Sequence, residues 1–203
     1  MKRFLDILAA VLAFLIFAPV IALIVVLILL KDGRPVFYVA ERMKTPSQPF
    51  NLIKFRTMSN APATTNAGVT GGDKNNRITP IGRKLRKYRL DELPQLYNIV
   101  KGDMSVVGPR PPLRQYTDAF PELYGKVLRS RPGITGLATL HFHKREEQLI
   151  SAATTPEETE EIYTKRCIPR KATLDLIYNK HESVCFDVVI LWQTLVQILG
   201  RKG

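Results

Sequence analysis

The chain has 203 residues, a formal net charge of +12 and two cysteines, Cys167 and Cys185. Because domains run to roughly 100–200 residues, this length predicts one compact domain with an appendage. Hydrophobic residues make up 45% of the chain and charged residues 24%, which excludes a multi-span transporter and a disordered chain. Two cysteines build neither a disulfide framework nor a four-thiolate zinc site, so we expect a reducing compartment.

The chain begins with a long apolar segment. Between Phe4 and Leu30, 27 residues include only two, Asp6 and Pro19, that are not Ala, Val, Ile, Leu or Phe. A straight helix of that length measures roughly 40 Å, more than the ~30 Å of bilayer hydrocarbon, so a tilted spanning helix is one interpretation. A signal peptide fits less well, because its apolar core has about 7–15 residues and no small-residue cleavage site follows here.

A helix that enters the membrane and returns to the same face is the third interpretation. Pro19 lacks an amide hydrogen, so it should bend or break the helix. The halves, Phe4–Phe17 and Val20–Leu30, each reach only about 15–21 Å, too short to cross. Two basic residues lie on each flank, namely Lys2, Arg3, Lys31 and Arg34. A spanning helix usually has asymmetric flanks, which favours re-entry, but periodicity alone leaves the topology open.

After the apolar segment, the sequence predicts strands at Arg34–Ala40 and Phe50–Phe55, separated by a turn that contains proline. The eighteen residues Ser59–Asn76 carry almost no large apolar side chain, and a loop this long is either disordered or a functional lid. Helices are predicted at Pro80–Arg89 and Pro94–Val100, the second with proline at its start and glycine just beyond its end.

The second half is predicted to be largely helical. Val106–Pro112 (VVGPRPP) should be an extended loop, and helices are predicted at Thr117–Ser130 and Thr155–Arg166. Ala172–Tyr178 is ambiguous. If Cys185–Leu199 is a helix, its apolar residues cover more of the helix surface than a single narrow stripe facing the core would. It is therefore either a buried core helix or a helix that lies in the bilayer interface.

Positive charge is concentrated in one stretch. Seven cations and no acid lie between positions 74 and 89: Lys74, Arg77, Arg83, Lys84, Arg86, Lys87 and Arg89. A solvated helix face is one explanation, but unrelieved like charge favours an anionic neighbour. That neighbour would be a nucleic acid, anionic lipid headgroups or a phosphate-bearing substrate. Nucleic acid is the weakest choice, because the chain has no recognisable binding motif and carries an apolar anchor that such a protein does not need.

Two carboxylates, Asp91 and Glu92, directly follow the basic stretch. A helix that starts at Pro94 places them beside its N-terminus, where the partial positive charge favours anions. Arg86 and Arg89 act in the same direction, so we expect both acids to stay ionised at neutral pH. An acidic pair before a helix is most often a cap, and the pair alone leaves capping and catalysis both open.

The surrounding residues carry a family resemblance. The stretch from Arg83 to Pro112 (RKLRKYRLDELPQLYNIVKGDMSVVGPRPP) resembles the bacterial sugar transferase family, the monotopic phosphoglycosyl transferases. The resemblance continues in Asn51–Met58 (NLIKFRTM), in Arg131–Ala138 (RPGITGLA) and in the apolar segment with its central proline. It covers essentially the whole chain, and its most specific elements are Asp-Glu-Leu-Pro-Gln and Gly-Pro-Arg-Pro at this spacing.

The resemblance implies a two-step transfer. A UDP-sugar would donate its sugar phosphate to the enzyme with release of UMP, and undecaprenyl phosphate would then accept it. Asp91 would be the nucleophile and Glu92 its partner, acting as a base or orienting metal and water, while Mg²⁺ would bind the diphosphate and the Asp91 side chain. Chemistry agrees, because a carboxylate that attacks a diphosphate needs a divalent cation and guanidinium groups to neutralise like charge.

The resemblance also implies an α+β fold. A kinked re-entrant membrane helix would occupy residues 1–32, and residues 33–203 would form a mostly helical cytoplasmic domain with a small sheet and interfacial amphipathic helices. The protein would lie at the cytoplasmic face of a bacterial inner membrane and make the first lipid-linked intermediate of a surface glycan. Ala18 stands where the family commonly has a serine before the proline, so a hydroxyl able to bond a freed carbonyl is missing.

Further site residues follow from the same motifs. Lys54 and Arg56 should share one face of a strand and either contact phosphate or have a structural role. Arg86 lies roughly one and a half helical turns before the acidic pair, within reach of it. Arg110 is stiffened between two prolines and should contact the nucleotide, unless it forms a structural ion pair. Asp175 matches a position where the family carries a functional acid; the alternative is a buried acid paired with arginine.

Some features lie outside the resemblance. Thr139–His143 stands where family members often continue with Gln, Asn and Gly-Arg, so sugar contacts there do not transfer. His141 and His143 alternate as metal ligands on a strand do, but without a third ligand nearby we expect no zinc site. A non-enzymatic membrane adaptor that binds anionic lipid is the rival from another class. The sequence leaves the sugar, the pathway and the oligomeric state open.

Overall fold

The computed structural model describes residues 1–59 and 76–200, so the long loop predicted at Ser59–Asn76 lies almost wholly outside the described residues. The first half contains α1 (Lys2–Lys31), β1 (Phe37–Thr45), β2 (Gln48–Phe55), α2 (Pro80–Lys87), the 3-10 turn η3 (Leu90–Glu92), α3 (Gln95–Lys101) and β3 (Ser105–Val107). The second half contains α4 (Arg114–Ala119), α5 (Pro121–Val127), β4 (Gly133–Thr135), α6 (Leu137–Ser151), α7 (Pro156–Ile162), the π-helical turn η4 (Tyr163–Cys167), α8 (Ile168–His181) and α9 (Val184–Leu199). The mostly helical fold with little sheet confirms the predicted class.

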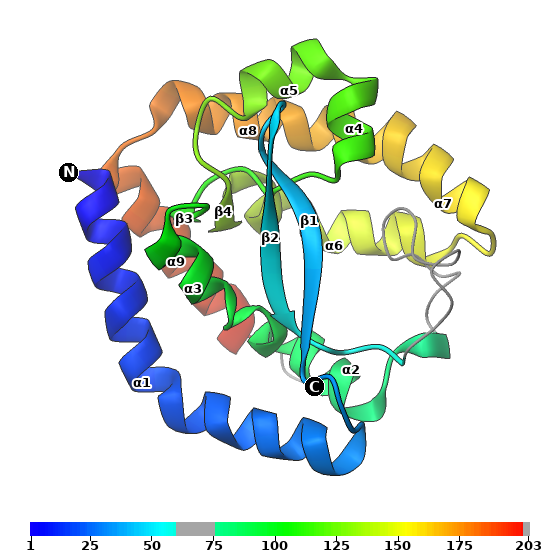
Figure 1. The fold of residues 1–203 in the computed structure, drawn as a ribbon. Coiled ribbons are helices and arrows are strands. Elements are labelled where there is room, and N and C mark those ends of the chain that lie inside the picture. The colour runs from blue at the N-terminus through cyan, green and yellow to red at the C-terminus, as the bar shows by residue number, and fades with distance from the viewer. Residues whose placement is uncertain (60–75, 201–203) are drawn as a thin grey trace.

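The strands form an antiparallel hairpin of β1 with β2 and a short parallel pair of β3 with β4. Figure 1 shows the hairpin crossing the middle of the molecule. The first strand was predicted to end at Ala40, but it continues to Thr45, where the Thr45 hydroxyl accepts a hydrogen bond from the Gln48 amide (3.1 Å) and closes a tight turn. In this register Tyr38 pairs with Lys54 and Arg42 with Phe50.

The predicted helices appear as α2, α3 and α7 with η4, one predicted helix is divided, and α6 was not predicted. The predicted helix Thr117–Ser130 divides into α4 and α5, because Pro121 cannot donate the hydrogen bond that would continue α4 and instead begins the next helix. Thr155 caps α7 as predicted, accepting from the amide three residues on (3.2 Å). The ambiguous segment Ala172–Tyr178 lies inside α8.

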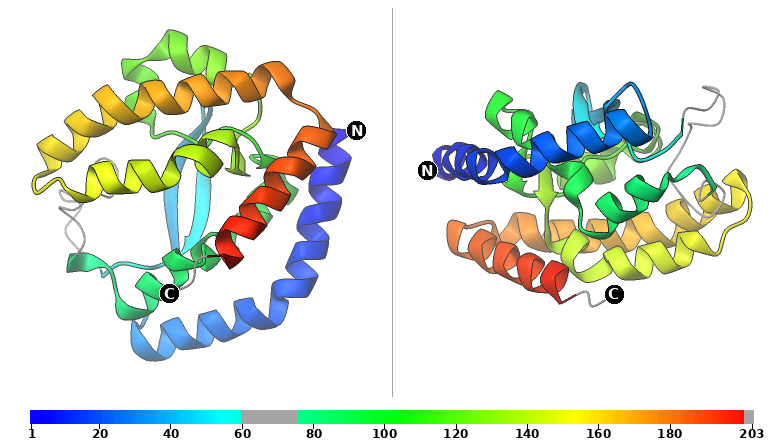
Figure 2. Two further views of the ribbon diagram at one scale, coloured as in Figure 1. Left: turned by 180° about the vertical axis from the view of Figure 1, so that it is seen from behind. Right: turned by 90° about the horizontal axis from the view of Figure 1, so that it is seen from below.

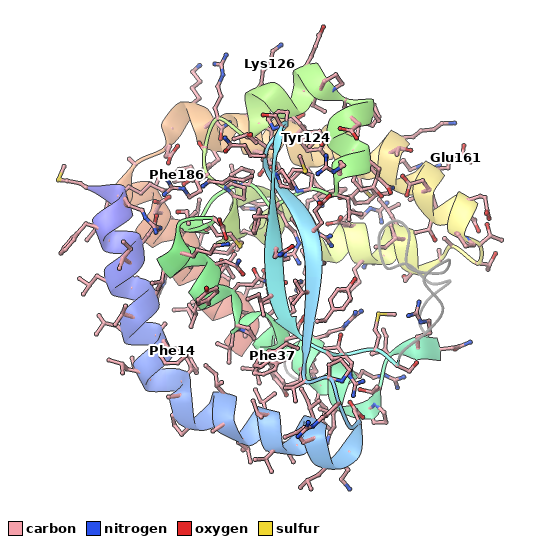
Figure 3. The ribbon with its side chains drawn as sticks, viewed as in Figure 1. Phe14, Phe37, Tyr124, Lys126, Glu161 and Phe186 are labelled. Atoms are coloured by element: carbon pink, nitrogen blue, oxygen red, sulfur yellow. The ribbon has the colours of Figure 1, made fainter. Side chains whose placement is uncertain are left out.

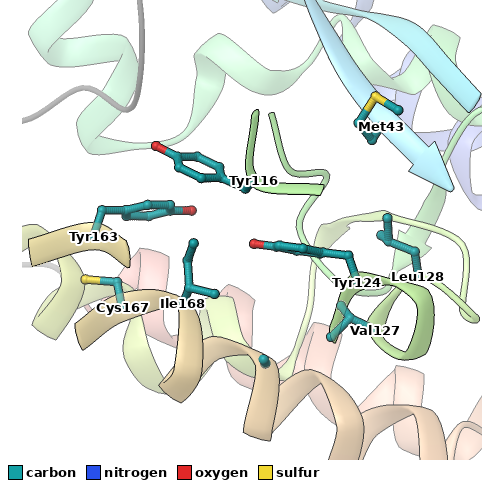
Figure 4. Packing of buried hydrophobic residues seen from close by; sticks show 9 residues of the cluster. Met43, Tyr116, Tyr124, Val127, Leu128, Tyr163, Cys167 and Ile168 are labelled. Carbon is teal, nitrogen blue, oxygen red and sulfur yellow. The ribbon is translucent and has the colours of Figure 1, made fainter. Parts of the chain in front are cut away.

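The long helices lie in two groups, with α1 on the same side of the molecule as the hairpin (Figure 2). In the right-hand view of Figure 2, α1 lies on one side of the molecule and α6, α8 and α9 lie on the other. One apolar cluster joins α4, α5, η4 and α8, and Figure 4 shows Ile168 between the rings of Tyr124 and Tyr163. A second cluster packs Ala10 of α1 against β2 and α3.

The apolar helix α1 contains Pro19, and its ribbon changes direction partway along in Figure 1. Within the described residues it is the only helix both long and apolar enough to cross a membrane. Many of its apolar side chains are exposed, among them Phe4, Leu15 and Leu30. In Figure 3 the side chains along α1 are almost all carbon, whereas charged groups such as Lys126 and Glu161 lie on other edges.

The N-terminal end of α1 is fastened to the body of the protein. Lys2 forms an ion pair with Asp187 of α9 (2.6 Å) and donates to the carbonyl of Val107 (3.2 Å). Asp6 is buried, and its carboxylate accepts a hydrogen bond from the hydroxyl of Ser105 (2.9 Å). The first two turns of this helix therefore hold strand β3.

The C-terminal end of α1 is fastened to the same body. The carboxylate of Asp32 accepts a hydrogen bond from the Thr79 hydroxyl (2.8 Å). The buried guanidinium of Arg56 donates to the carbonyl oxygens of Gly33 (2.7 Å) and Arg34 (3.0 Å). Both ends of the apolar helix thus contact one folded unit.

The last helix, α9, carries a second exposed apolar surface. Ile190 and Asp187 are buried, because this side of α9 faces α6 and the β3–β4 pair. Val188 and Val196 are exposed, and Trp192 is 67% exposed. The interpretation of this segment as a buried core helix is therefore wrong for much of its surface.

Candidate active site

The acidic pair lies on the short turn η3 between α2 and α3. Asp91 and Glu92 are 8% and 5% exposed. Arg89, which precedes η3, has a left-handed backbone (φ 55°, ψ 23°), a conformation that is uncommon outside glycine and frequent at functional sites. The following helix begins at Gln95 with Pro94 as its cap, one residue later than predicted.

Glu92 neutralises three cations. Its Oε1 lies 3.0 Å from Lys54 Nζ and 2.7 Å from the Arg110 guanidinium, and its Oε2 lies 2.6 Å from the Arg89 guanidinium. Burial alone would raise the pKa of Glu92, but these three positive charges outweigh it and hold the pKa well below its ordinary value. Glu92 is therefore a fixed anion that joins three separate segments of the chain.

Asp91 has a different environment. Among residues 1–59 and 76–200, no side chain or amide donates a hydrogen bond to its carboxylate and no cation forms an ion pair with it. Burial raises its pKa and Glu92 acts in the same direction, while Lys54 and Arg86 only partly compensate. The sequence predicts that both acids stay ionised. The direction of the pKa shift agrees with this for Glu92, whereas at Asp91 burial outweighs the nearby cations and raises the pKa.

Arg86 reaches the neighbourhood of Asp91 from α2. Its Nε donates to the hydroxyl of Thr57 (2.9 Å), which fixes the side chain at the end of β2. Burial lowers the pKa of Arg86, and the nearby Asp91 carboxylate raises it. Gly82 allows α2 to approach this closely, since a Cβ there would overlap the Thr57 backbone.

Buried polar contacts set the positions of the other two segments. The amide of Asn98 on α3 bridges β2, accepting from the Ile53 amide (3.1 Å) and donating to the Asn51 carbonyl (2.8 Å). This bridge fixes the strand that carries Lys54. The Arg110 loop is held against β4, because the Gly108 amide donates to the carbonyl of Thr135 (2.9 Å) and a Cβ on Gly108 would overlap the backbone of the neighbouring segment.

Three predicted cations, Lys54, Arg86 and Arg110, therefore surround the predicted acidic pair. The two other predicted residues lie elsewhere. Arg56 lies beyond the end of β2 and binds the end of α1, so it does not share the direction of Lys54. Asp175 lies on α8, where burial raises its pKa to about 7 and Lys171 acts against this. Its buried Oδ1 has no hydrogen-bond partner, and no arginine forms an ion pair with it in the part of the chain that is described.

The two candidate zinc ligands, His141 and His143, lie on helix α6 rather than on a strand. The described residues contain no group of three or more His, Cys, Asp or Glu side chains able to hold a metal ion. The basic stretch also divides: Arg83, Lys84 and Lys87 are exposed, whereas Arg86 and Arg89 turn inward, and Lys74 lies outside the described residues.

Sequence reasoning did not include Arg89 among the site residues. Its spacing of three residues from Glu92 was the available signal, because side chains three apart can meet along one turn. The left-handed backbone that directs Arg89 toward Glu92 could not be read from the sequence.

The family assignment follows from comparison with known proteins. Residues 1–201 match the family model described as bacterial sugar transferase. The chain belongs to the bacterial sugar transferase family. The match includes the acidic pair, the hairpin with Lys54 and the loop with Arg110, so the site described above lies in the region that defines the family.

Relatives of this sugar transferase carry more detailed names. Exopolysaccharide production protein ExoY of Rhizobium meliloti (strain 1021) is 42% identical over 216 residues, which cover all of this chain and 87% of that protein. UDP-N-acetylgalactosamine-undecaprenyl-phosphate N-acetylgalactosaminephosphotransferase of Aeromonas hydrophila is 34% identical over 207 residues, all of this chain and 44% of that protein. UDP-glucose:undecaprenyl-phosphate glucose-1-phosphate transferase of Caulobacter vibrioides is 40% identical over 144 residues, 68% of this chain and 52% of that protein. The chain spans about half the length of the latter two relatives or less.

The role of Glu92 as a buried counter-charge predicts a large effect of Glu92→Gln on stability. Three buried or partly buried cations would lose their anion, so the free energy of unfolding should fall by about 3–5 kcal/mol at neutral pH. Because the folded-state pKa of Glu92 is lowered, its contribution is complete at neutral pH and disappears as the pH falls through that pKa. Chemical denaturation in detergent micelles from pH 7 downward measures both effects.

Glu41→Gln is the matched control, because Glu41 also pairs with an arginine, Arg114, but at the surface. This variant should unfold almost as the wild type does. Equal stability of the Glu92→Gln variant and the wild type at pH 7 would show that the three cations do not depend on this carboxylate.

Proposed function

We propose that this sugar transferase moves a sugar 1-phosphate from a UDP-sugar to undecaprenyl phosphate and releases UMP. The names of the Aeromonas and Caulobacter relatives support this reaction class. The observation that carries the proposal is the contrast within the acidic pair. Glu92 is bound to three cations, whereas the carboxylate of Asp91 has no partner within the described residues and is available to react.

In the first step, a carboxylate oxygen of Asp91 attacks the phosphorus that bears the sugar. An acyl-phosphate bond forms, the bond between that phosphorus and the bridging oxygen breaks, and its electron pair leaves on that oxygen with UMP. Burial raises the pKa of Asp91 because it removes water from the carboxylate, and a desolvated carboxylate is a better nucleophile than a hydrated one.

In the second step, a phosphate oxygen of undecaprenyl phosphate attacks the same phosphorus. The acyl-phosphate bond breaks, its electron pair returns to the Asp91 carboxylate, and the sugar diphosphate lipid departs. Splitting the reaction lets a water-soluble donor and a lipid acceptor use one site in turn.

The charges of the site suit an anionic substrate. Lys54, Arg86, Arg89 and Arg110 surround the two carboxylates, so positive charge is in excess. Arginine pairs well with phosphate through its planar fork of N–H groups, and charge placed in advance stabilises the negative charge that develops during phosphoryl transfer.

The donor set also fits Mg²⁺. This ion is usually held by one or two carboxylates together with substrate phosphates and waters, and Asp91 offers a carboxylate without a competing ion pair in the described chain. When bound, the ion would neutralise charge on the diphosphate. Glu92 is a poorer ligand, because both of its oxygens already contact cations.

We further propose that α1 is a re-entrant helix at the cytoplasmic face of a bacterial inner membrane. The contacts of Lys2 and Asp6 at one end, and of Asp32 at the other, fasten both ends to one folded unit, which does not suit a helix with ends on opposite sides of a bilayer. Because Pro19 lies between two short arms, the helix has a physical reason to bend. The exposed apolar sides of α1 and α9 would lie in the lipid and its interface.

The reaction predicts UMP release from at least one UDP-sugar by purified protein, and loss of that release in Asp91→Asn. The amide is not a nucleophile here, so both UMP formation and lipid product should fall by at least about 1,000-fold. Asp118→Asn, at an exposed position, should keep wild-type activity. Retained turnover in Asp91→Asn would exclude Asp91 as the nucleophile, and a non-enzymatic membrane adaptor would release no UMP with any donor.

The re-entrant topology predicts labelling from one side only. One cysteine added ahead of Lys2 and another introduced as Lys31→Cys, in a background with Cys185→Ser, should both react with an impermeant maleimide in inside-out vesicles. Neither should react in intact spheroplasts. Labelling of the two positions from opposite sides would establish a spanning helix.

A further inference from the structure

Arg42 is a partly buried cation on β1 without a carboxylate partner among residues 1–59 and 76–200. Its Nη1 donates a hydrogen bond to the backbone carbonyl of the neighbouring Glu41 (2.8 Å). The Glu41 carboxylate itself faces Arg114 (2.7 Å) at the surface. Burial lowers the pKa of Arg42, and nearby Arg110 lowers it further. A charge withdrawn from water without a counter-charge is unfavourable, so this position is suited to an anionic ligand.

The hairpin directs Arg42 toward the same side as Lys54. Tyr38 pairs with Lys54 across the strands, and Arg42 follows Tyr38 by four residues along β1. Cross-strand partners and alternate residues of a strand share a face, so Arg42 and Lys54 project from one face roughly 13 Å apart along the hairpin.

The Arg110 loop lies in the interval between them. The amide of Met43, next to Arg42, donates to the carbonyl of Pro112 (3.0 Å), which joins β1 to this loop. Arg110 bonds Glu92 and also lies close enough to Arg42 to alter its pKa. Positive groups therefore continue from the acidic pair through Arg110 to Arg42.

We propose that Arg42 binds the donor phosphate that leaves with the nucleoside, as an anion-binding position beyond Arg110. This inference rests on the proposed function. In the proposed reaction the attacked phosphorus of the nucleoside diphosphate sugar lies at Asp91. The second phosphate is joined to it through one bridging oxygen. Cations that extend away from Asp91 are therefore placed to bind this second phosphate. A guanidinium can bind that phosphate through two parallel N–H···O bonds.

The position favours the water-soluble donor over the lipid acceptor. In Figure 1 the end of the hairpin near the β1–β2 turn points toward α4 and α5, whereas α1 follows other edges of the molecule. A polyprenol chain would approach from the apolar side, while a nucleotide needs no such access. Arg42 would therefore distinguish the two half-reactions.

The test compares Arg42→Gln, Arg42→Lys and the surface control Arg114→Gln in the full-length protein in detergent micelles. For Arg42→Gln, we expect the donor KM and the UMP inhibition constant to rise about 10- to 100-fold, the range of one charge-assisted hydrogen-bonding group. The acceptor KM and the thermal midpoint should stay unchanged. Arg42→Lys should recover part of the donor affinity, and Arg114→Gln should behave as the wild type.

Equilibrium binding of UDP to Asp91→Asn, with and without Arg42→Gln, separates this inference from the proposed reaction. Weaker UDP binding in the double variant supports the role of Arg42, even if the wild type releases no UMP and the proposed reaction fails. Unchanged UDP binding and an unchanged donor KM would overturn the inference, as would an equal rise in the donor and acceptor KM values. If Arg42→Gln does not fold, Arg42→Lys replaces it in the same comparison. Wild-type UDP affinity and wild-type UMP inhibition in Arg42→Lys, at every ionic strength, would then overturn the inference.

Discussion

The site depends on one buried carboxylate that is shared by three cations. Lys54 comes from the hairpin, Arg89 from the residue before η3 and Arg110 from the loop after β3, and all three contact Glu92 within 3.0 Å. Like charges brought this close repel one another, and their desolvation is compensated only by an anion in the same place. Because Glu92 provides that charge, its neighbour Asp91 remains without an ion pair in the described chain. Two adjacent carboxylates thereby acquire different properties from their surroundings alone.

The site is also supported by the apolar helix. Asp6 accepts hydrogen bonds from Ser105 and the Val106 amide, and Lys2 bonds the carbonyl of Val107. Strand β3 leads within three residues to Arg110, so α1 contacts the segment that positions this guanidinium. In the proposed reaction, fastening this apolar helix to the rest of the protein would hold Asp91 at a fixed depth relative to lipid headgroups. An acid inside an otherwise apolar segment then has a structural explanation.

Local sequence signals were sufficient where the chemistry is local. Pro94 indicated where α3 begins, to within one residue, and the prolines beside Arg110 indicated an extended loop. The prediction for Arg56 depended on alternation along a strand, but β2 ends at Phe55, so the alternation no longer fixes the direction of the next side chain. The raised pKa of Asp91 could not be inferred, because desolvation depends on what packs around the site rather than on neighbouring residues. The same holds for Arg42, whose lack of a carboxylate partner is a property of the tertiary structure.

The most direct measurement locates the covalent intermediate. Protein incubated with a turnover-competent UDP-sugar and Mg²⁺, without a lipid acceptor, is quenched, digested and analysed by mass spectrometry for a glycosyl phosphate adduct. We expect the adduct on Asp91 and none on Glu92, because the oxygens of Glu92 are already held by cations. An adduct on Glu92 or on any other side chain would contradict the division of roles between the two acids.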